Sequence, residues 1–526
     1  MRVTSTGYDD PDKPTSNDPA SDYRVGWKLR QPITTTTDPG SAPHLDLKSI
    51  TRYDKTTGLV IETRMPANPA GGDAHSSKTI YYTGDTSSGD SACNSKPQFA
   101  NLACKTLPAA QPGTTGLPNL PVTQTSYNRY NQPTTVTETV GTTTRTTTTS
   151  YDTAGRTTDL AIASTVGTAL PTVHTDYDPT TGQAITSTAD GSGTATIIRG
   201  YDTLGRLTSY QDADSTSPAT TTYDLLDRPA TVSDGKGTQT LTYDTSIDPR
   251  GLATSLADSA AGTFTARYDP DGNLTTQGYP NGMEARTTID PTGSPTELAY
   301  VKTSNCTSGC TWLDFHTNQS IHDQILDQTS GLSAQDHTYD PAGRLTQVQD
   351  TPTGGGCTIR TYSHDADSNR LSLNTKPPAA DGTCDTAATG TTTSHTYDPA
   401  DRITDSGFAY DTFGRITTVP AAAAGTTGDI TASYYTSDMV RALTQAGTTH
   451  TWTLDPNRRL RGRTDSGGST GTRTNHYADD TDSPAWIGRG RDRDPLDPQH
   501  QRLRQRPGRH PGLHHRHHPA AFGPAR

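Results

Sequence analysis

One short string in the chain could supply a catalytic nucleophile. Gly467-Gly-Ser-Thr-Gly471 matches the G-x-S-x-G pattern, in which the serine attacks an acyl carbon. That chemistry needs a buried strand before the serine and a helix after it. Here the flanking segments, 463–466 and 472–474, belong to a stretch rich in Gly, Ser and Thr. We therefore interpret the match as a loop that fits the pattern by chance.

The acidic and histidine residues give no stronger indication of a site. Asp269-Pro-Asp-Gly-Asn273 resembles the start of a calcium loop but lacks the closing bidentate glutamate, and a turn explains it better. His316 and His322 have no partners that spacing can identify. The chain contains neither HExxH nor a glycine-rich phosphate loop between a strand and a helix. We expect no catalytic activity, no cofactor and no metal site.

Six cysteines stand in close sets, which suits local disulfides and an oxidising compartment. An alternative is a zinc site built from the Cys-x3-Cys pair and the later pair, although the later pair lacks the usual knuckle spacing. The cysteines are Cys93 and Cys104, Cys306 and Cys310, and Cys357 and Cys384.

One unit recurs far more often than an active site would. Tyr201-Asp-Thr-Leu-Gly-Arg206 is followed by an alternating stretch, and similar units return along the chain. From Tyr127 to Tyr268 the steps between units are 24, 26, 24, 22, 20 and 25 residues. Such a period indicates an array whose units bury their apolar faces against their neighbours. The clearest turn residues are Tyr151, Asp152, Gly155, Arg156, Tyr201, Asp202, Gly205, Arg206, Tyr339, Asp340, Gly343, Arg344, Tyr410, Asp411, Gly414 and Arg415.

Each unit can be interpreted as a turn between two strands. Asp followed three places later by Gly favours a type I turn, with the carboxylate accepting backbone N–H bonds. Glycine can take the left-handed conformation that makes a bulged hairpin. The Asp and Arg of one unit lie near enough to pair and fix the turn. The following strand alternates, which places one face on a core and a Thr-rich face toward solvent.

Composition agrees with strands. Only 29% of the 526 residues are hydrophobic, yet the chain has 23 tyrosines and abundant threonine, and both residue types favour sheets. The net charge of −12 argues against a general nucleic-acid role. No apolar run is long enough for a membrane span. The first ten residues lack the apolar segment of a signal peptide.

Tyr-Asp-x-x-Gly-Arg-Leu/Ile-Thr resembles the YD repeat of the RHS family, which includes bacterial RHS and wall-associated proteins and the teneurin shell. The resemblance covers residues 53–486. It implies an all-β fold: a repeat array of antiparallel hairpins forming a spiralling sheet, here an incomplete cocoon. It also implies a non-catalytic shell fragment that encloses a C-terminal toxin and helps to deliver it in bacterial competition. The implied partners are the rest of the shell and that toxin, with an extracellular or cell-wall location for the intact parent protein. The Asp-Pro-x-Gly-type self-cleavage site of bacterial members is not found.

Surface adhesion or carbohydrate binding by exposed Tyr and Trp is the alternative function, with surface glycans as the partners.

We divide the chain by where the units occur. Residues 1–52 show no clear unit and are expected to be irregular. Residues 53–486 form the repeat region, in which 65–121 is expected to be a loop insertion and 300–336 a decorated hairpin. Residues 487–526 lose Thr and Tyr and gain nine Arg and six His. This tail could be a basic nucleic-acid arm, a metal tract at residues 514–518, or a frameshifted and disordered segment. We favour the frameshift.

Overall fold

A computed structural model of the chain describes residues 3–8, 31–54, 56–66, 74–191, 195–213, 215–304, 306–467 and 471–489. The described residues form two antiparallel sheets and hardly any helix. The first sheet has 29 strands, and the second has eight. Each strand pairs with the strands before and after it in sequence, so both sheets are meanders. This is the all-β hairpin array that the repeat pattern predicts.

The first part of the large sheet runs from β1 to β15. Its strands are β1 (Thr4–Tyr8), β2 (Pro32–Thr37), β3 (Leu47–Tyr53), β4 (Val60–Arg64), β5 (Ser77–Tyr81), β6 (Ala103–Pro108), β7 (Val122–Tyr127), β8 (Pro133–Val140), β9 (Thr143–Tyr151), β10 (Thr157–Ser164), β11 (Val173–Tyr177), β12 (Ala184–Ala189), β13 (Ala195–Tyr201), β14 (Leu207–Gln211) and β15 (Ala219–Tyr223). Two short 3-10 helices, η2 (Ser91–Cys93) and η3 (Pro97–Phe99), lie between β5 and β6.

The large sheet continues to β29. Its remaining strands are β16 (Pro229–Ser233), β17 (Thr238–Thr242), β18 (Ser255–Asp258), β19 (Gly262–Tyr268), β20 (Leu274–Gly278), β21 (Met283–Ile289), β22 (Pro295–Lys302), β23 (Thr311–Gln319), β24 (Ile325–Ser330), β25 (Ser333–Tyr339), β26 (Leu345–Pro352), β27 (Thr358–His364), β28 (Arg370–Lys376) and β29 (Thr391–Ser394).

The second sheet holds the C-terminal part of the described chain. It contains β30 (Ala409–Tyr410), β31 (Ile416–Val419), β32 (Ile430–Tyr434), β33 (Val440–Gln445), β34 (Thr448–Leu454), β35 (Leu460–Ser466), β36 (Gly471–His476) and β37 (Trp486–Arg489). A one-turn helix, α1 (Ala421–Ala424), separates β31 from β32.

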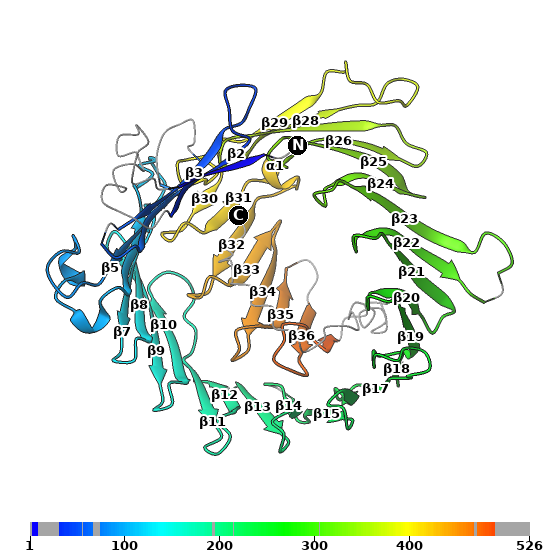
Figure 1. Cartoon of the computed structure of the whole chain (residues 1–526), viewed down its shortest axis with the longest axis horizontal. Helices are drawn as coiled ribbons and strands as arrows, with labels where there is room; N and C mark the ends of the chain where they lie inside the picture. The colour runs from blue at the N-terminus through cyan, green and yellow to red at the C-terminus, as the bar shows by residue number, and fades with distance from the viewer. Residues whose placement is uncertain are drawn as a thin grey trace.

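The large sheet curves around a ring that its two end strands do not close by pairing (Figure 1). In this view the second sheet lies within the outline of the ring. Backbone contacts show how the two sheets meet: the amide of Thr168 donates to Tyr434 O at 2.8 Å, and the amide of Thr436 donates to Thr168 O at 3.0 Å. These two bonds form a parallel bridge between Thr168 and Tyr435. The chain is therefore a spiral whose second turn packs on its first.

The apolar core is divided among small clusters, because a thin, Thr-rich sheet has few large side chains to bury. One cluster gathers Tyr82, Cys93 and Cys104, with Phe99 and Tyr127 packed against them. Another joins Ile197 and Tyr210 of the first sheet to Tyr477, which follows β36. The second cluster places apolar packing between the two turns of the spiral.

The structure differs from the sequence-based division in several places. Residues 32–37 and 47–53 form β2 and β3, although no clear unit marks most of this segment. Strands β5 and β6 continue the meander through the expected loop insertion. β22 to β25 continue it through 300–336, because Ser320 and Gln324 close a turn of the same kind without a Tyr-Asp pair. β37 extends the second sheet to Arg489, past the expected boundary at 487.

Candidate functional site

The repeat turn is the first candidate site, and the unit at Tyr201 shows its construction. Asp202 Oδ1 accepts the amide protons of Leu204 and Arg206, at 2.9 and 3.0 Å. Asp202 Oδ2 accepts the Nε proton of Arg206 at 2.7 Å. Gly205 has a φ of +82°, and the strand register shifts between Gly200 and Tyr201. This is the bulged hairpin that the Asp-x-x-Gly spacing predicts.

The same carboxylate–arginine pair closes the other three turns that sequence singles out. It joins Asp152 to Arg156, Asp340 to Arg344, and Asp411 to Arg415. The corresponding glycines, Gly155, Gly343 and Gly414, all have positive φ. In the Tyr201 unit, the hydrogen bond from Arg206 holds the pKa of the Asp202 carboxyl below its usual value. The pair therefore favours the ionised form of this carboxyl.

Side chains of each unit also contact the units before and after it. The Tyr201 hydroxyl donates to Ala184 O at 3.0 Å, and Ala184 is the first residue of the neighbouring strand, β12. In the other direction, the Arg206 guanidinium lies 4.6 Å from the centroid of the Tyr223 ring and donates to Asp227 at 2.5 Å. The tyrosine thus links a unit to the one before it, and the arginine links it to the one after. These contacts explain why Tyr, Asp and Arg recur together.

Sequence reasoning missed several turns of this type because their letters differ. Asp455 pairs with Arg459 in a unit whose tyrosine position is Leu454. In the Tyr127 unit, which the sequence does predict, Asn128 and Gln132 replace Asp and Arg, and the Asn128 side chain still accepts the amide proton of Gln132. An Asp followed four places later by Arg, without the tyrosine, could have found the Asp455 copy in the sequence. Arg458 stands at its glycine position and has positive φ.

The seam, defined here as the contacts between the two turns of the spiral, is the second candidate site. Arg199 on β13 donates to Asp480 Oδ1 at 2.6 Å, across 281 residues of sequence. Arg461 on β35 donates to Asp212 Oδ2 at 2.7 Å, across 249 residues. Arg459 donates to the Tyr210 hydroxyl at 2.7 Å. In these contacts the three arginines are buried, and they hold the second sheet on strands β13 and β14 of the first.

The electrostatics of the seam depend on both burial and pairing. Burial raises the pKa of Asp212, but the hydrogen bond to His476 and the charge of Arg461 outweigh it, and the net shift is downward. Asp480 behaves in the same way, with Arg199 as its main partner. Burial wins at Asp455, whose pKa is raised although Arg459 opposes the shift. Ion pairs in the seam and in the adjoining Asp455–Arg459 turn therefore differ in how fully they offset the effect of burial on the pKa.

All six cysteines are joined in local disulfides. The structure pairs Cys93 with Cys104, Cys306 with Cys310, and Cys357 with Cys384. No thiolate remains for the alternative zinc site, because the six described cysteines are all oxidised. Cys93 and Cys104 belong to the aromatic cluster between β5 and β7, so this bridge also supports packing. Chain-entropy arguments give the least stabilisation to the bridge with the shortest loop, Cys306–Cys310.

The other described motifs make only local contacts, within a few residues of sequence. Asp269 accepts amide protons from Asp271 and Asn273, as a turn residue does. His316 pairs with Asp314 on an exposed strand face. Part of the G-x-S-x-G string, residues 468–470, lies outside the described residues, as does the His tract at 514–518.

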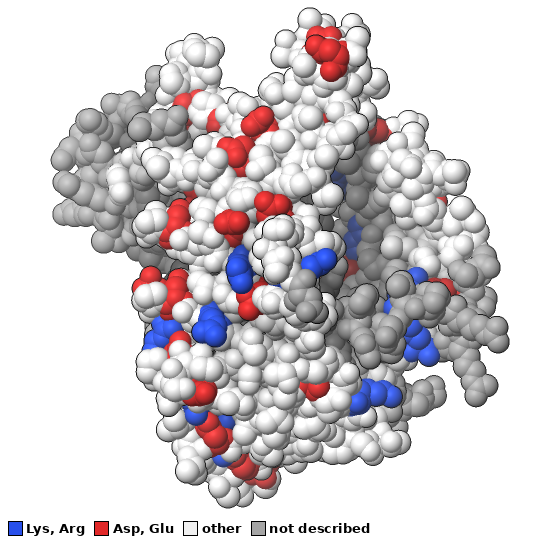
Figure 2. Space-filling model, turned by 90° about the vertical axis from the view of Figure 1, so that its right-hand side faces the viewer, with Lys and Arg blue, Asp and Glu red and all other residues white. Residues whose placement is uncertain are grey.

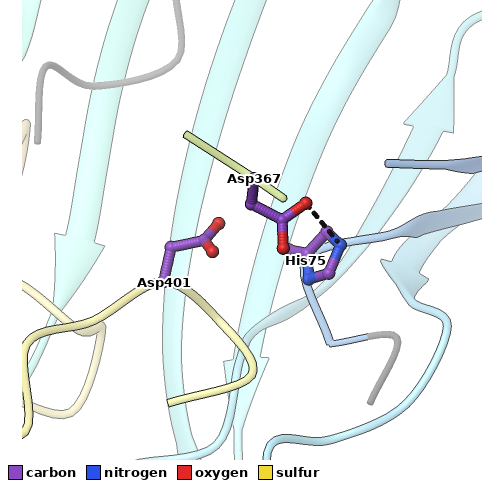
Figure 3. A group of neighbouring side chains, drawn as sticks. All are labelled: His75, Asp367 and Asp401. Atoms are coloured by element: carbon purple, nitrogen blue, oxygen red, sulfur yellow. Dashed lines mark ion pairs between the residues drawn. The ribbon is translucent and has the colours of Figure 1, made fainter. Parts of the chain in front are cut away.

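Three segments far apart in the sequence meet at the third candidate site (Figure 3). His75 precedes β5, Asp367 lies in the turn between β27 and β28, and Asp401 lies in the turn after β29. His75 Nε2 is 3.5 Å from Asp367 Oδ1, and the ligand atoms of the three residues lie within 4.8 Å of one another. Burial raises the pKa of Asp367 to about 6; the charge of His75 opposes this shift, and Asp401 and Asp365 add to it.

No protein family and no curated protein matches the sequence. Among solved structures, the chain is similar to TcdB2-TccC3, with 13% identity and a TM-score of 0.49 over 86% of this chain and 29% of that one. It is also similar to TcdB2-TccC3-Cdc42, with 12% identity and a TM-score of 0.47 over 86% and 28%. The Photorhabdus luminescens Tc holotoxin pore gives 14% identity and a TM-score of 0.45 over 86% and 24%. The chain thus spans less than a third of each of these chains. At such low identities and scores, these likenesses assign no residue and no activity.

Proposed function

We propose that the chain is a structural, non-catalytic part of an RHS-type shell that encloses a C-terminal toxin and helps to deliver it. The seam supports this proposal: a second turn that docks on the first, through residues 249 to 281 positions apart, is what a wall around an enclosed volume would need. The YD-repeat resemblance supplies the nature of the cargo. The rest of the shell and the toxin are the proposed partners, and the intact protein is proposed to act outside the cell.

Surface charge supports a wall and not a nucleic-acid platform. On the face shown in Figure 2, acidic and basic side chains are interspersed in small groups among uncharged residues. A nucleic-acid site needs concentrated positive charge to displace counterions from phosphate. Many arginines of the described chain are instead engaged by carboxylates within turns or across the seam. Among the described residues, no helix is long and apolar enough to cross a membrane.

The test of enclosure is protection from protease in the complete product of the gene. The whole protein should be expressed and treated with a protease of broad specificity. A shell predicts that the C-terminal cargo survives while the wall is intact and becomes sensitive in the seam variant Arg459→Met. The matched control is Arg206→Met, which removes an arginine of the same motif outside the seam. Equal digestion of the cargo in all three proteins would contradict the proposal.

Adhesion is the second candidate function, and one exposed aromatic pair favours it. Trp312 is 66% exposed and packs edge-on against Tyr300, at 6.4 Å between ring centroids. An exposed indole of this kind can stack on the apolar face of a sugar. Binding to a panel of surface glycans, lost in Trp312→Ala, would support adhesion. If the unmodified chain binds none of these glycans, the adhesion function is contradicted.

A further inference from the structure

The cluster of His75, Asp367 and Asp401 is built from departures from the repeat unit. Asp367 stands where the Tyr201 unit has Leu204, and Asn369 stands where that unit has its arginine. Asp401 occupies the glycine position of its own turn and keeps the left-handed backbone, with a φ of +57°. Two carboxylates are thus added, and a guanidinium that would neutralise them is absent from the Asp365–Asn369 turn.

The added groups are buried without the hydrogen bonds that burial usually requires. The side chains of His75 and Asp367 are only 4% and 3% exposed. His75 Nε2 and both carboxylate oxygens of Asp367 have no hydrogen-bond partner. Leaving such groups unpaired costs on the order of 1–3 kcal/mol each, and more where they are charged. Asp401 is held beside them, because Asn369 Nδ2 donates to Asp401 Oδ1 at 2.8 Å.

The orientation of His75 points to what the cluster can bind. His75 Nδ1 lies 3.1 Å from Pro399 O, and a carbonyl can only accept, so Nδ1 carries the proton in the neutral ring. The lone pair of Nε2 then faces Asp367. Metal-ligating histidines are commonly held in this way, with the second ring nitrogen donating to a backbone carbonyl. The imidazole is therefore presented to the two carboxylates as a ligand.

The spacing also suits a metal ion. Two ligands on a tetrahedral Zn²⁺ ion, each bonded at about 2.1 Å, lie about 3.4 Å apart. The distance from His75 Nε2 to Asp367 Oδ1 is 3.5 Å, too long for a normal hydrogen bond. One imidazole with two carboxylates suits zinc and its transition-metal neighbours, whereas Ca²⁺ takes six to eight oxygen ligands.

We propose that His75, Asp367 and Asp401 bind one divalent transition-metal ion of the zinc class. The ion ties the segment before β5 to two turns of the later repeats, across a contact that joins residues 324 positions apart. It acts as a clip that holds the start of the spiral against its later part. The proposal needs only the fold and does not depend on a cargo or a delivery role.

The test is metal binding by the full chain, made without an affinity tag and stripped of metal. Zn²⁺ would be titrated by calorimetry, and Co²⁺ by its visible absorption, in a background where the five residues 514–518 are replaced by Ala. This background removes the histidine-rich tract at 514–518, which could bind metal by itself. We expect one equivalent to bind, the Co²⁺ spectrum to be that of a tetrahedral site, and Zn²⁺ to raise the unfolding midpoint.

The variants decide whether the ion lies in this cluster. Asp367→Asn and His75→Gln should each weaken binding about tenfold or more, and should remove the stabilisation by Zn²⁺. Asp401→Asn provides a third variant if either of these folds poorly. His316→Gln is the matched control, because His316 also lies beside a carboxylate, Asp314, but on the surface. The proposal is overturned if the background chain binds no Zn²⁺, or if the cluster variants bind it as well as the control does.

Discussion

The same Asp–Arg turn occurs in two settings in this molecule. In the Tyr201 unit, Asp202 and Arg206 are 23% and 26% exposed, and their pair is partly open to solvent at the turn between β13 and β14. In the second sheet, Asp455 and Arg459 are 0% and 3% exposed and contact the first turn of the spiral. The local geometry is shared, but the surroundings differ. The same motif therefore only forms a turn in the first setting, whereas in the second it also binds the second sheet to the first.

The difference teaches where the energy of the fold lies. An exposed ion pair contributes about 0–1 kcal/mol, because water screens it and offers an alternative. Removing one partner of a buried pair leaves an uncompensated charge and costs about 3–5 kcal/mol. The repeat turn therefore sets the path of the chain everywhere, whereas it contributes strongly to stability only at the seam.

The largest effect is expected for Arg459→Met. The substitution leaves the Asp455 carboxylate buried without its partner and removes a hydrogen bond to the Tyr210 hydroxyl. We expect a loss of about 3–5 kcal/mol in the free energy of unfolding, measured by urea denaturation of the second sheet with tryptophan fluorescence. Arg206→Met should lose less than about 1 kcal/mol. Equal losses in the two variants would remove the distinction between the settings.

A smaller effect is expected where the backbones of the two turns approach each other. Gly167 has a φ of +92°, and an added Cβ would lie 3.1 Å from the backbone of Tyr434 and Tyr435. Gly293 has a nearly equal φ of +89°, with nothing within 4 Å of such a Cβ. Gly167→Ala should cost about 2–3 kcal/mol, and Gly293→Ala about 1–2 kcal/mol from backbone strain alone. Thermal denaturation checks this, and identical shifts would argue against close packing at the seam.

Removing a tyrosine hydroxyl should lower the free energy of unfolding more at the seam than within the first sheet, but by a smaller difference than the changes above. Tyr210 accepts a hydrogen bond from the Arg459 guanidinium, whereas the Tyr223 hydroxyl donates to Leu207 O within the first sheet. Tyr210→Phe should cost about 1.5–3 kcal/mol, because the lost hydrogen bond involves a charged group. Tyr223→Phe should cost about 0.5–1.5 kcal/mol. Denaturation midpoints of the two variants give the comparison, and the reverse order would contradict it.

The smallest and broadest effect is expected from acid. The pKa values of Asp212 and Asp480 are lowered in the folded chain. Their contribution to stability is therefore full above the carboxyl's ordinary pKa of 3.8 and is lost as pH falls through the folded values. Trp486 donates to Asp234 O across the seam, so its fluorescence should report undocking below about pH 4. Undocking that begins near neutral pH would contradict this assignment.

Sequence could predict the unit but not the contacts between the turns of the spiral. Asp202, Gly205 and Arg206 act within five residues of one another, so their types and spacing carry the turn. The alternating strands predict the meander for the same reason. Arg199 and Asp480 meet only because the sheet curves through 281 residues, and no local pattern records that curvature. The cluster at His75 was likewise missed, since its three ligands come from three separate segments.

The spiral itself is tested most directly by a double-mutant cycle across the seam. Asp212 and Arg461 are 249 residues apart, both buried, and joined at 2.7 Å. The cycle compares Asp212→Asn, Arg461→Met and the double variant by urea denaturation followed through tryptophan fluorescence. The account predicts a coupling free energy of about 1.5–3 kcal/mol, in the range of residues that share a charged hydrogen bond. Additivity within about 0.5 kcal/mol would mean that the two turns do not touch there.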